Sequence, residues 1–201
     1  MAGNGKVDFS DLDTFRKNLE ENLGEDQIEL FIESCAKELT ARLLAKVIKR
    51  IQPGKKPKLQ GEKYKIVEVK NAEGKTRKKK FLSAEAARLE QYWSGYIGGT
   101  LRRGWTGGKD QDARVYAQSL KVQHVGDKFI IEVVNPVKYA SYVEFGHRQT
   151  PGRYVPALGK RLKGSWVEGK FMLTTSEQEI KRDAPKVLEN KLKKKLGECF
   201  K

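Results

Sequence analysis

The sequence predicts an α+β fold with a long N-terminal helix, a small mainly antiparallel sheet, a C-terminal helix and an inserted basic β-hairpin. Apolar residues repeat with helical spacing over residues 28–47 and again over 180–196. Between these stripes lie short segments rich in β-branched and aromatic residues, separated by glycine-containing turns. We expect residues 1–201 to form a single domain, in which residues 54–94 are an insertion carrying a hairpin and a helix.

Two helices are predicted at the N-terminus. Ser10 is placed to cap a short amphipathic helix that Gly24 ends, with its apolar face formed by Leu12, Phe15, Leu19 and Leu23. A second helix begins near Asp26, and Pro53 with Gly54 ends it; its stripe consists of Ile28, Ile32, Cys35, Leu39, Leu43 and Val47. At about 25 residues this helix is ~37 Å long, more than a small core needs. Helices of such length often pack against a sheet or a neighbouring subunit.

The insertion begins with a polar connector over residues 53–63. Residues 64–70 alternate as a strand does, residues 71–74 form a turn, and residues 75–82 return as a second strand. Four consecutive basic side chains lie on this second strand: Arg77, Lys78, Lys79 and Lys80. Ser83 is the expected N-cap of a helix that reaches Tyr92 and Trp93.

A glycine-rich stretch over residues 95–108 follows that helix. A phosphate-binding P-loop around Gly108 and Lys109 needs glycine at position 103 and a hydroxyl at position 110. The chain has Arg103 and Asp110 there, so the pattern argues against a P-loop NTPase. We expect a flexible connector that is bent at its glycines.

The next segment predicts a second hairpin, with strands over residues 115–122 and 128–134 that close at Asn135 and Pro136. Residues 139–146 then predict a short helical turn that ends at Gly146. After a loop, Ser176 and Glu179 form a possible capping box for the last helix, whose stripe is Ile180, Ala184, Val187, Leu188, Leu192 and Leu196. Because Pro185 falls inside this pattern, the helix either kinks there or begins near Asp183.

Charge is unevenly distributed along the chain, which has a formal net charge of +15. Residues 46–80 hold 14 basic and 3 acidic side chains, whereas residues 1–45 hold 5 basic and 10 acidic ones. This excess predicts an acidic partner or a polyanion, and opposite signs on different faces suit a ring or stack of subunits. A basic loop that only keeps the protein soluble is the alternative. No apolar run approaches the ~20 residues needed to cross a bilayer, so we expect a soluble intracellular protein without membrane contact.

The sequence indicates no catalytic, metal or cofactor site. Cys35 and Cys199 are the only cysteines and His124 and His147 the only histidines, and no CxxC pair is present for zinc. A reduced pair of cysteines and a disulfide between them are both possible. A metal nuclease needs two or three clustered acids, and Asp110 and Asp112 are the only close acidic pair in this region. We therefore expect no enzyme activity.

Residues 139–147, Tyr-Ala-Ser-Tyr-Val-Glu-Phe-Gly-His, resemble the minor tail-component proteins of long-tailed bacteriophages, the tail-completion or neck family. The family core reads loosely Tyr-Ala-x-x-Val-Glu-Phe-Gly after a hairpin. Residues 99–103 are similar to its Gly-x-Leu-Arg element, and residues 153–158 to its Pro-Ala-Leu segment. Together the resemblance covers roughly residues 28–53 and 98–196. It departs from the family where about 45 residues, including the basic hairpin, separate the long helix from Leu101 and Arg102.

The resemblance implies a structural role in a virion tail or neck, assembled in the cytoplasm of a bacterial host. Such proteins form rings, often of six copies, that join the tail tube to tail-terminator, connector or collar proteins. The family motif would then supply interface residues: Leu101, Arg102, Tyr139, Ala140, Tyr142, Val143, Glu144, Phe145 and Gly146. Alternatively, Tyr139, Val143 and Phe145 fill the monomer core, while Glu144 accepts hydrogen bonds from backbone donors or pairs with an arginine such as Arg102.

A nucleic-acid-binding protein is the rival prediction. Basic residues over 46–80, with Arg77, Lys78, Lys79 and Lys80 foremost, would neutralise phosphates or contact an acidic partner. No nucleic-acid reader motif accompanies them. The tail-protein and nucleic-acid predictions are compatible if the subunits form a ring, the basic segment lines its channel, and DNA passes through that channel.

Overall fold

The computed structural model describes residues 3–6, 24–70 and 72–199. The chain divides into two compact units: the first consists of Met1–Pro53, Gly99–His147 and Glu168–Lys201, and the second of Gly54–Gly98 and Arg148–Val167. The predicted α+β class is confirmed. The short helix expected over residues 12–23 lies outside the described residues, and the insertion of 54–94 into a single domain stays a prediction.

The first unit contains the longest helices. Its helices are α2 (Glu25–Arg50), α4 (Thr100–Gly104), α5 (Ala113–Ser119), α6 (Ala140–Phe145) and α7 (Met172–Cys199). Its strands are β1 (Gly3–Lys6), β4 (Gln123–Val125), β5 (Lys128–Ile130) and β6 (Glu132–Asn135). The chain passes between the units after Pro53 and Gly98, and again within β7 (Gly146–Arg148) and β10 (Trp166–Glu168).

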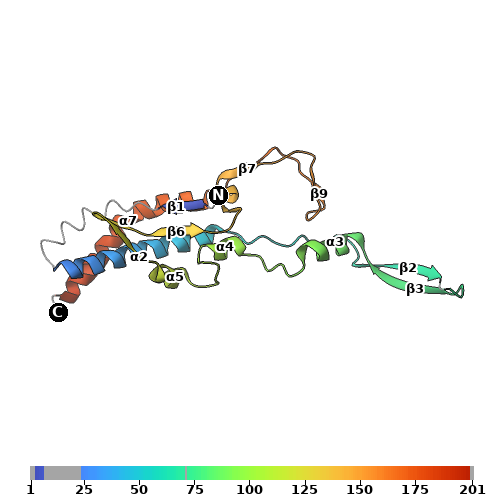
Figure 1. Cartoon of the computed structure of the whole chain (residues 1–201), viewed down its shortest axis with the longest axis horizontal. Helices are drawn as coiled ribbons and strands as arrows, with labels where there is room; N and C mark the ends of the chain where they lie inside the picture. The colour runs from blue at the N-terminus through green and yellow to red at the C-terminus, as the bar shows by residue number, and fades with distance from the viewer. Residues whose placement is uncertain (1–2, 7–23, 71, 200–201) are drawn as a thin grey trace. The chain divides into compact units, whose positions relative to one another are not determined.

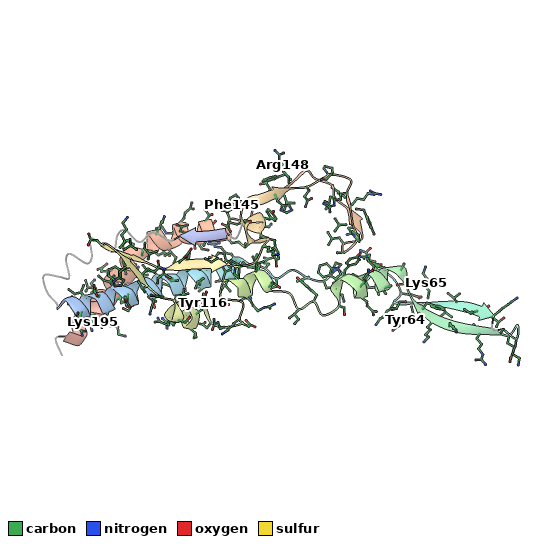
Figure 2. All side chains as sticks on the ribbon, viewed as in Figure 1. Tyr64, Lys65, Tyr116, Phe145, Arg148 and Lys195 are labelled. Atoms are coloured by element: carbon green, nitrogen blue, oxygen red, sulfur yellow. The ribbon has the colours of Figure 1, made fainter. Side chains whose placement is uncertain are left out.

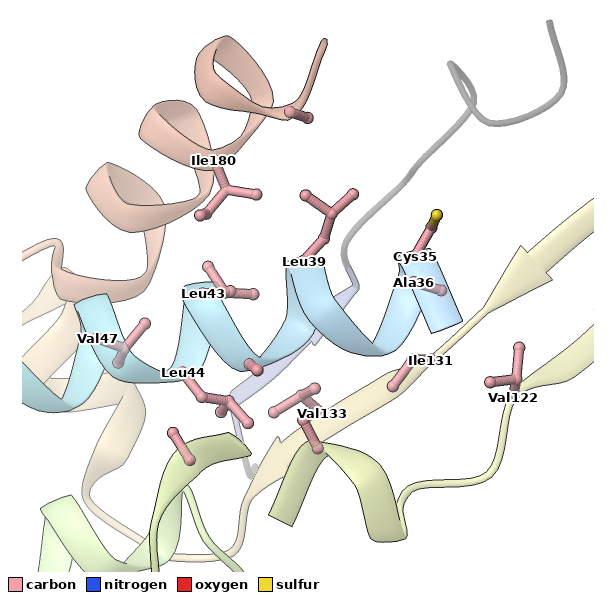
Figure 3. Packing of buried hydrophobic residues seen from close by; sticks show 14 of the residues in the cluster. Cys35, Ala36, Leu39, Leu43, Leu44, Val47, Val122, Ile131, Val133 and Ile180 are labelled. Carbon is pink, nitrogen blue, oxygen red and sulfur yellow. The ribbon is translucent and has the colours of Figure 1, made fainter. Parts of the chain in front are cut away.

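Helix α2 is the centre of the hydrophobic core, as its apolar stripe predicts. In Figure 3, α7 lies along one side of α2 and presents Ile180 toward it, while α5 and β6 lie along the other. The fully buried residues include Ile32, Leu39, Leu43, Val47, Ile131 and Val133. Lys46 also pairs with Glu179 at 3.0 Å across the α2–α7 contact. Because that pair is partly exposed, burial of the apolar stripe contributes most of the stability of this contact.

Helix α5 replaces the first strand of the hairpin predicted over residues 115–134, so that part of the prediction is wrong. Ala113 and Ala117 lie on one helical face and are buried against α2. The Asp112 carboxylate accepts a hydrogen bond from the Arg114 backbone N–H at 2.7 Å and caps the helix. Small residues four apart allow close helix packing, which outweighs the β-propensity of Val115 and Tyr116.

Replacing Asp112 with alanine is expected to lower the free energy of unfolding by about 1 kcal/mol, because the cap of α5 is lost. Chemical denaturation followed by circular dichroism measures the change. Asp110→Ala is the matched control: Asp110 is exposed just before the cap, and its removal is expected to change stability by less than about 0.5 kcal/mol. Equal effects of the two substitutions would contradict the capping role of Asp112.

The strands of the first unit form two-stranded ladders rather than one continuous sheet. Strands β4 and β5 make a short antiparallel hairpin in which His124 faces Phe129. Strand β6 pairs antiparallel with β1, and Gly3 lies opposite Asn135. The second strand predicted over 128–134 is thus divided between β5 and β6, which pair with different partners.

Helix α7 begins eight residues before the earliest residue of its predicted stripe. Ser176 lies inside the helix, where its hydroxyl donates a hydrogen bond to the Met172 carbonyl, so the predicted capping box is wrong. Pro185 is also inside the helix, which excludes a start near Asp183. Ile180, Ala184 and Leu188 are buried as the stripe predicts. The helix starts early because its first turn is capped from elsewhere in the chain, as described below.

The second unit contains the predicted basic hairpin, and here the prediction is confirmed. Strands β2 (Tyr64–Lys70) and β3 (Thr76–Leu82) form a two-stranded antiparallel ribbon (Figure 1). Helix α3 (Ala84–Trp93) follows, and the Ser83 hydroxyl accepts a hydrogen bond from the Ala86 N–H, as expected of an N-cap. Strands β8 (Tyr154–Val155) and β9 (Lys160–Arg161) complete the unit.

Helix α3 holds the loop between β8 and β9. The indole N–H of Trp93 donates a hydrogen bond to the Ala157 carbonyl at 2.7 Å, and the Arg88 guanidinium donates to the same carbonyl at 3.0 Å. Two side chains that converge on one carbonyl fix the position of this loop. The Pro-Ala-Leu segment at 156–158 is therefore bound by residues of the predicted insertion.

Cys35 is a free thiol on the buried face of α2. Burial raises its pKa to about 11, so the neutral thiol is the form present near neutral pH. It packs as a small apolar side chain in the core.

Candidate functional site

Helix α6 presents its aromatic side chains to solvent. Tyr139, Tyr142 and Phe145 follow one another at intervals of three residues, which places them on one face of the helical turn. They are 45%, 57% and 58% exposed. The opposite face carries Ala140 and Glu144, both of which are buried. The helix is therefore amphipathic in an unusual sense: aromatic rings point outward and a carboxylate points inward.

Phe171 extends this aromatic surface from the segment that leads into α7. Its ring packs edge-to-face against Phe145 with 6.4 Å between the centroids, and it is 44% exposed. We call Tyr139, Tyr142, Phe145 and Phe171 the aromatic patch. Figure 2 labels Phe145, the last residue of α6, directly before β7. Exposed apolar groups gathered in this way mark interaction surfaces more often than scattered single residues do.

The buried carboxylate of Glu144 caps the N-terminus of α7. It accepts hydrogen bonds from the backbone N–H groups of Leu173 at 3.0 Å and Thr174 at 2.9 Å, and from the Thr174 hydroxyl at 2.9 Å. These N–H groups belong to the first turn of α7, where a helix has no internal acceptors and carries a partial positive charge. Phe171, whose carbonyl accepts the first helical hydrogen bond, has no side-chain oxygen to cap with. Glu144 supplies that oxygen from 27 residues earlier in the chain.

The backbones of the two segments also meet directly. The N–H groups of Lys170 and Phe171 donate to the carbonyls of Val143 and Glu144 at 2.8 and 3.0 Å. A Cβ atom on Gly169 would lie only 2.4 Å from the Glu144 carbonyl oxygen, so only glycine fits this approach. The aromatic patch therefore rests on a rigid junction between α6 and α7.

A second anchor fixes the chain before α6. Asn135 is fully buried, and its amide donates a hydrogen bond to the Leu101 carbonyl at 3.0 Å and accepts one from the Val137 N–H at 3.1 Å. Gly104 packs against it so closely that a Cβ there would clash with the Asn135 oxygen. Helix α4 thus stands where the sequence predicts only a flexible connector. Through Asn135 it positions the residues that lead into the aromatic patch.

The structure decides between the alternatives for the family motif. Tyr139 and Phe145 are half exposed, so the prediction that they fill the monomer core is wrong; Val143 alone packs against the core. Glu144 contacts backbone donors, as one alternative predicts, and its hydrogen bonds do not involve Arg102. Leu101 is buried, whereas Arg102 is exposed beside an open groove that Asp110 and Asp112 also line. The interface role of these residues stays a prediction.

The predicted basic residues lie in the other unit. Arg77, Lys78, Lys79 and Lys80 are all on β3 and all exposed. They are considered separately below.

Sequence reasoning missed three residues of the site: Asn135, Gly169 and Phe171. The sequence places Asn135 only at the end of a hairpin, and its burial against α4 is visible only in the tertiary structure. Gly169 and Phe171 lie far from the motif in sequence, and no local pattern links them to it.

The described residues contain no group of three or more His, Cys, Asp or Glu side chains placed to hold a metal ion. In the same part of the chain, no helix combines the length and apolarity that a membrane span requires.

The protein-family model described as "Bacteriophage HK97-gp10, putative tail-component" matches residues 13–146. Neither the curated proteins nor the solved structures give a match. The matched residues include α2, α4, α5 and the whole of α6.

Proposed function

The chain belongs to the HK97-gp10-like family of bacteriophage tail components, and from this premise we propose that it is a structural assembly protein at the head-proximal end of a phage or phage-like tail. The family model covers about two thirds of the chain. In this proposal, copies of the chain form an oligomeric ring, of six copies by family resemblance, which joins the tail tube to the connector or collar.

The observation that carries the proposal is the outward aromatic face of α6. A turn whose only purpose is to fill a core buries its rings, because each aromatic ring removed from water contributes to stability. Here Tyr142 and Phe145 are more than half exposed. Glu144, Gly169 and Asn135 hold the backbone beneath them. A rigid surface rich in aromatic residues is typical of the centre of a protein–protein interface.

We propose that the aromatic patch contacts a second copy of the chain or the next tail protein. The partners are the tail-tube, tail-terminator and connector proteins, and the place of action is the virion tail or neck after assembly in the host cytoplasm. A tail component acts through the surfaces that it presents, so the proposed role is non-enzymatic and needs no cofactor.

Localisation in the particle tests this proposal. The gene is deleted from its phage or prophage and supplied in trans with a short tag on the chain, and particles are imaged by electron microscopy with a tag-specific label. We expect label at the head-proximal end of the tail, and tails that do not attach to heads when the chain is withheld. Complete, infectious particles without the chain, or label at the distal tip, would overturn the proposal.

A further inference from the structure

We propose that the β2–β3 ribbon is an arm that binds double-stranded DNA through its phosphate backbone. This goes beyond the proposed assembly role, because it assigns a ligand to a segment that the aromatic patch does not use. The arm is defined as residues 64–82.

The arm carries a charge that its own residues do not neutralise. It holds seven lysine or arginine side chains and two glutamates. Glu68 pairs with Lys78 at 4.0 Å and Glu73 with Lys75 at 3.9 Å, and all four side chains are more than 60% exposed. Such long, solvated pairs cancel little of the field that a polyanion experiences.

The register of the ribbon places cations on both of its faces. Side chains alternate along each strand, so Lys78 and Lys80 lie on one face and Arg77 and Lys79 on the other. On strand β2, Lys70 shares the first face and Lys65 the second. Figure 2 shows side chains standing on both sides of the ribbon. The second face contains no acidic residue among its cross-strand pairs, which are Lys65 with Phe81, Val67 with Lys79 and Val69 with Arg77.

A ribbon with two cationic faces fits a groove with two anionic walls. The major groove of B-DNA is about 12 Å wide and admits a two-stranded β-ribbon. A ribbon seated there has a phosphate backbone on either side, and lysine or arginine on each face can reach the nearer one. Backbone contacts of this kind give affinity without sequence preference.

An acidic protein surface is the competing ligand, and the composition of the arm favours DNA. Protein–protein interfaces are depleted in lysine at their centres, whereas protein–DNA interfaces are strongly positive. Beyond the Tyr64–Leu82 pair at the base of the arm, the exposed apolar residues lie beside lysines, since Ile66 lies opposite Lys80 and Val67 opposite Lys79. Any protein that covered these residues would also have to desolvate the lysines beside them.

A backbone hydrogen bond fixes the base of the arm next to α3, so the basic side chains of the arm are attached to an ordered element. The Ser83 N–H donates a hydrogen bond to the Lys63 carbonyl at 2.9 Å and closes the ribbon directly before α3. Seven residue pairs then continue outward from Tyr64 and Leu82. A two-stranded ribbon has little stability of its own, and a ligand that bridges both strands would stabilise it.

Binding of a fluorescent duplex of about 25 base pairs to the full chain, followed by anisotropy over a range of salt concentrations, tests the proposal. The variant replaces Arg77, Lys78, Lys79 and Lys80 with glutamine. We expect it to bind at least tenfold more weakly at about 0.1 M salt, with a slope of log affinity against log salt that is smaller by up to about 3.5. The matched control replaces Lys186, Lys193, Lys194 and Lys195 of α7 with glutamine, which removes the same formal charge, and is expected to lose less than about threefold in affinity.

Two half-variants test the two-faced geometry: Lys78→Gln with Lys80→Gln, and Arg77→Gln with Lys79→Gln. We expect losses within about threefold of each other, since each pair faces one phosphate backbone. The proposal is overturned if the wild-type chain does not bind the duplex, or if the arm and α7 variants lose affinity equally. It is also overturned if the arm variant keeps its DNA affinity but fails in particle assembly, an outcome that would assign the arm to an acidic protein partner.

Discussion

Replacing Glu144 with alanine is expected to lower the free energy of unfolding by about 2–4 kcal/mol. The substitution leaves the N–H groups of Leu173 and Thr174 in a buried junction without their acceptor. Hydrogen bonds to a charged partner contribute about 1.5–3 kcal/mol each, and a lost cap costs up to about 2. Urea denaturation followed by circular dichroism and tryptophan fluorescence measures the change.

Two further variants separate the capping role from a general loss of charge. Glu144→Gln keeps one carbonyl oxygen as an acceptor and is expected to lose about half as much stability as alanine does. Glu132→Ala removes an exposed carboxylate from β6 and should change stability by less than about 0.5 kcal/mol. If Glu144→Ala is as stable as the wild-type chain, the junction between α6 and α7 does not depend on this cap.

The local structure of the chain could be predicted where local signals decide it. The residues of β2, β3 and α3 were predicted almost to their ends, because alternation, a glycine turn and the Ser83 cap lie within one short segment. Helix α5 was not predicted, although Asp112 is a good N-cap. Its β-branched and aromatic residues resemble a strand, and the burial of Ala117 against α2 is visible only in the tertiary structure.

The orientation of α6 could not be predicted from the motif. By general burial tendencies alone, aromatic rings lie inside a protein and a carboxylate lies outside, since charged groups are seldom buried. The structure reverses this order because the N-terminus of α7 needs an anionic acceptor, and only the fold brings it to residue 144. Burying the Glu144 carboxylate has a desolvation cost, which the hydrogen bonds from two backbone N–H groups offset. Exceptions of this kind to the usual burial pattern are common at functional sites.

The reversed orientation leads to the prediction with the largest expected effect on assembly. The double substitution Tyr142→Asp with Phe145→Asp is expected to lower incorporation of the chain into particles by at least about a hundredfold, while the free energy of unfolding changes by less than about 1 kcal/mol. Both rings are more than half exposed, so the folded chain loses little packing. An interface that buries them would have to bury two carboxylates instead. Complementation of a deletion strain and quantitative blotting of purified particles measure incorporation.

Leu30→Asp with Val115→Asp is the matched control for this variant. Leu30 and Val115 are each 61% exposed, lie in the same unit and are outside the aromatic patch. The control adds the same charge and removes similar exposed apolar area, so it separates a specific contact from a general effect of solubility. We expect incorporation within about threefold of wild type for this control, since surface changes away from an interface have small effects.

Equal losses for both double variants would show that the aromatic patch has no special part in assembly. Normal incorporation of the Tyr142 and Phe145 variant would remove the observation on which the assembly role depends, because these are the two most exposed rings of the aromatic patch.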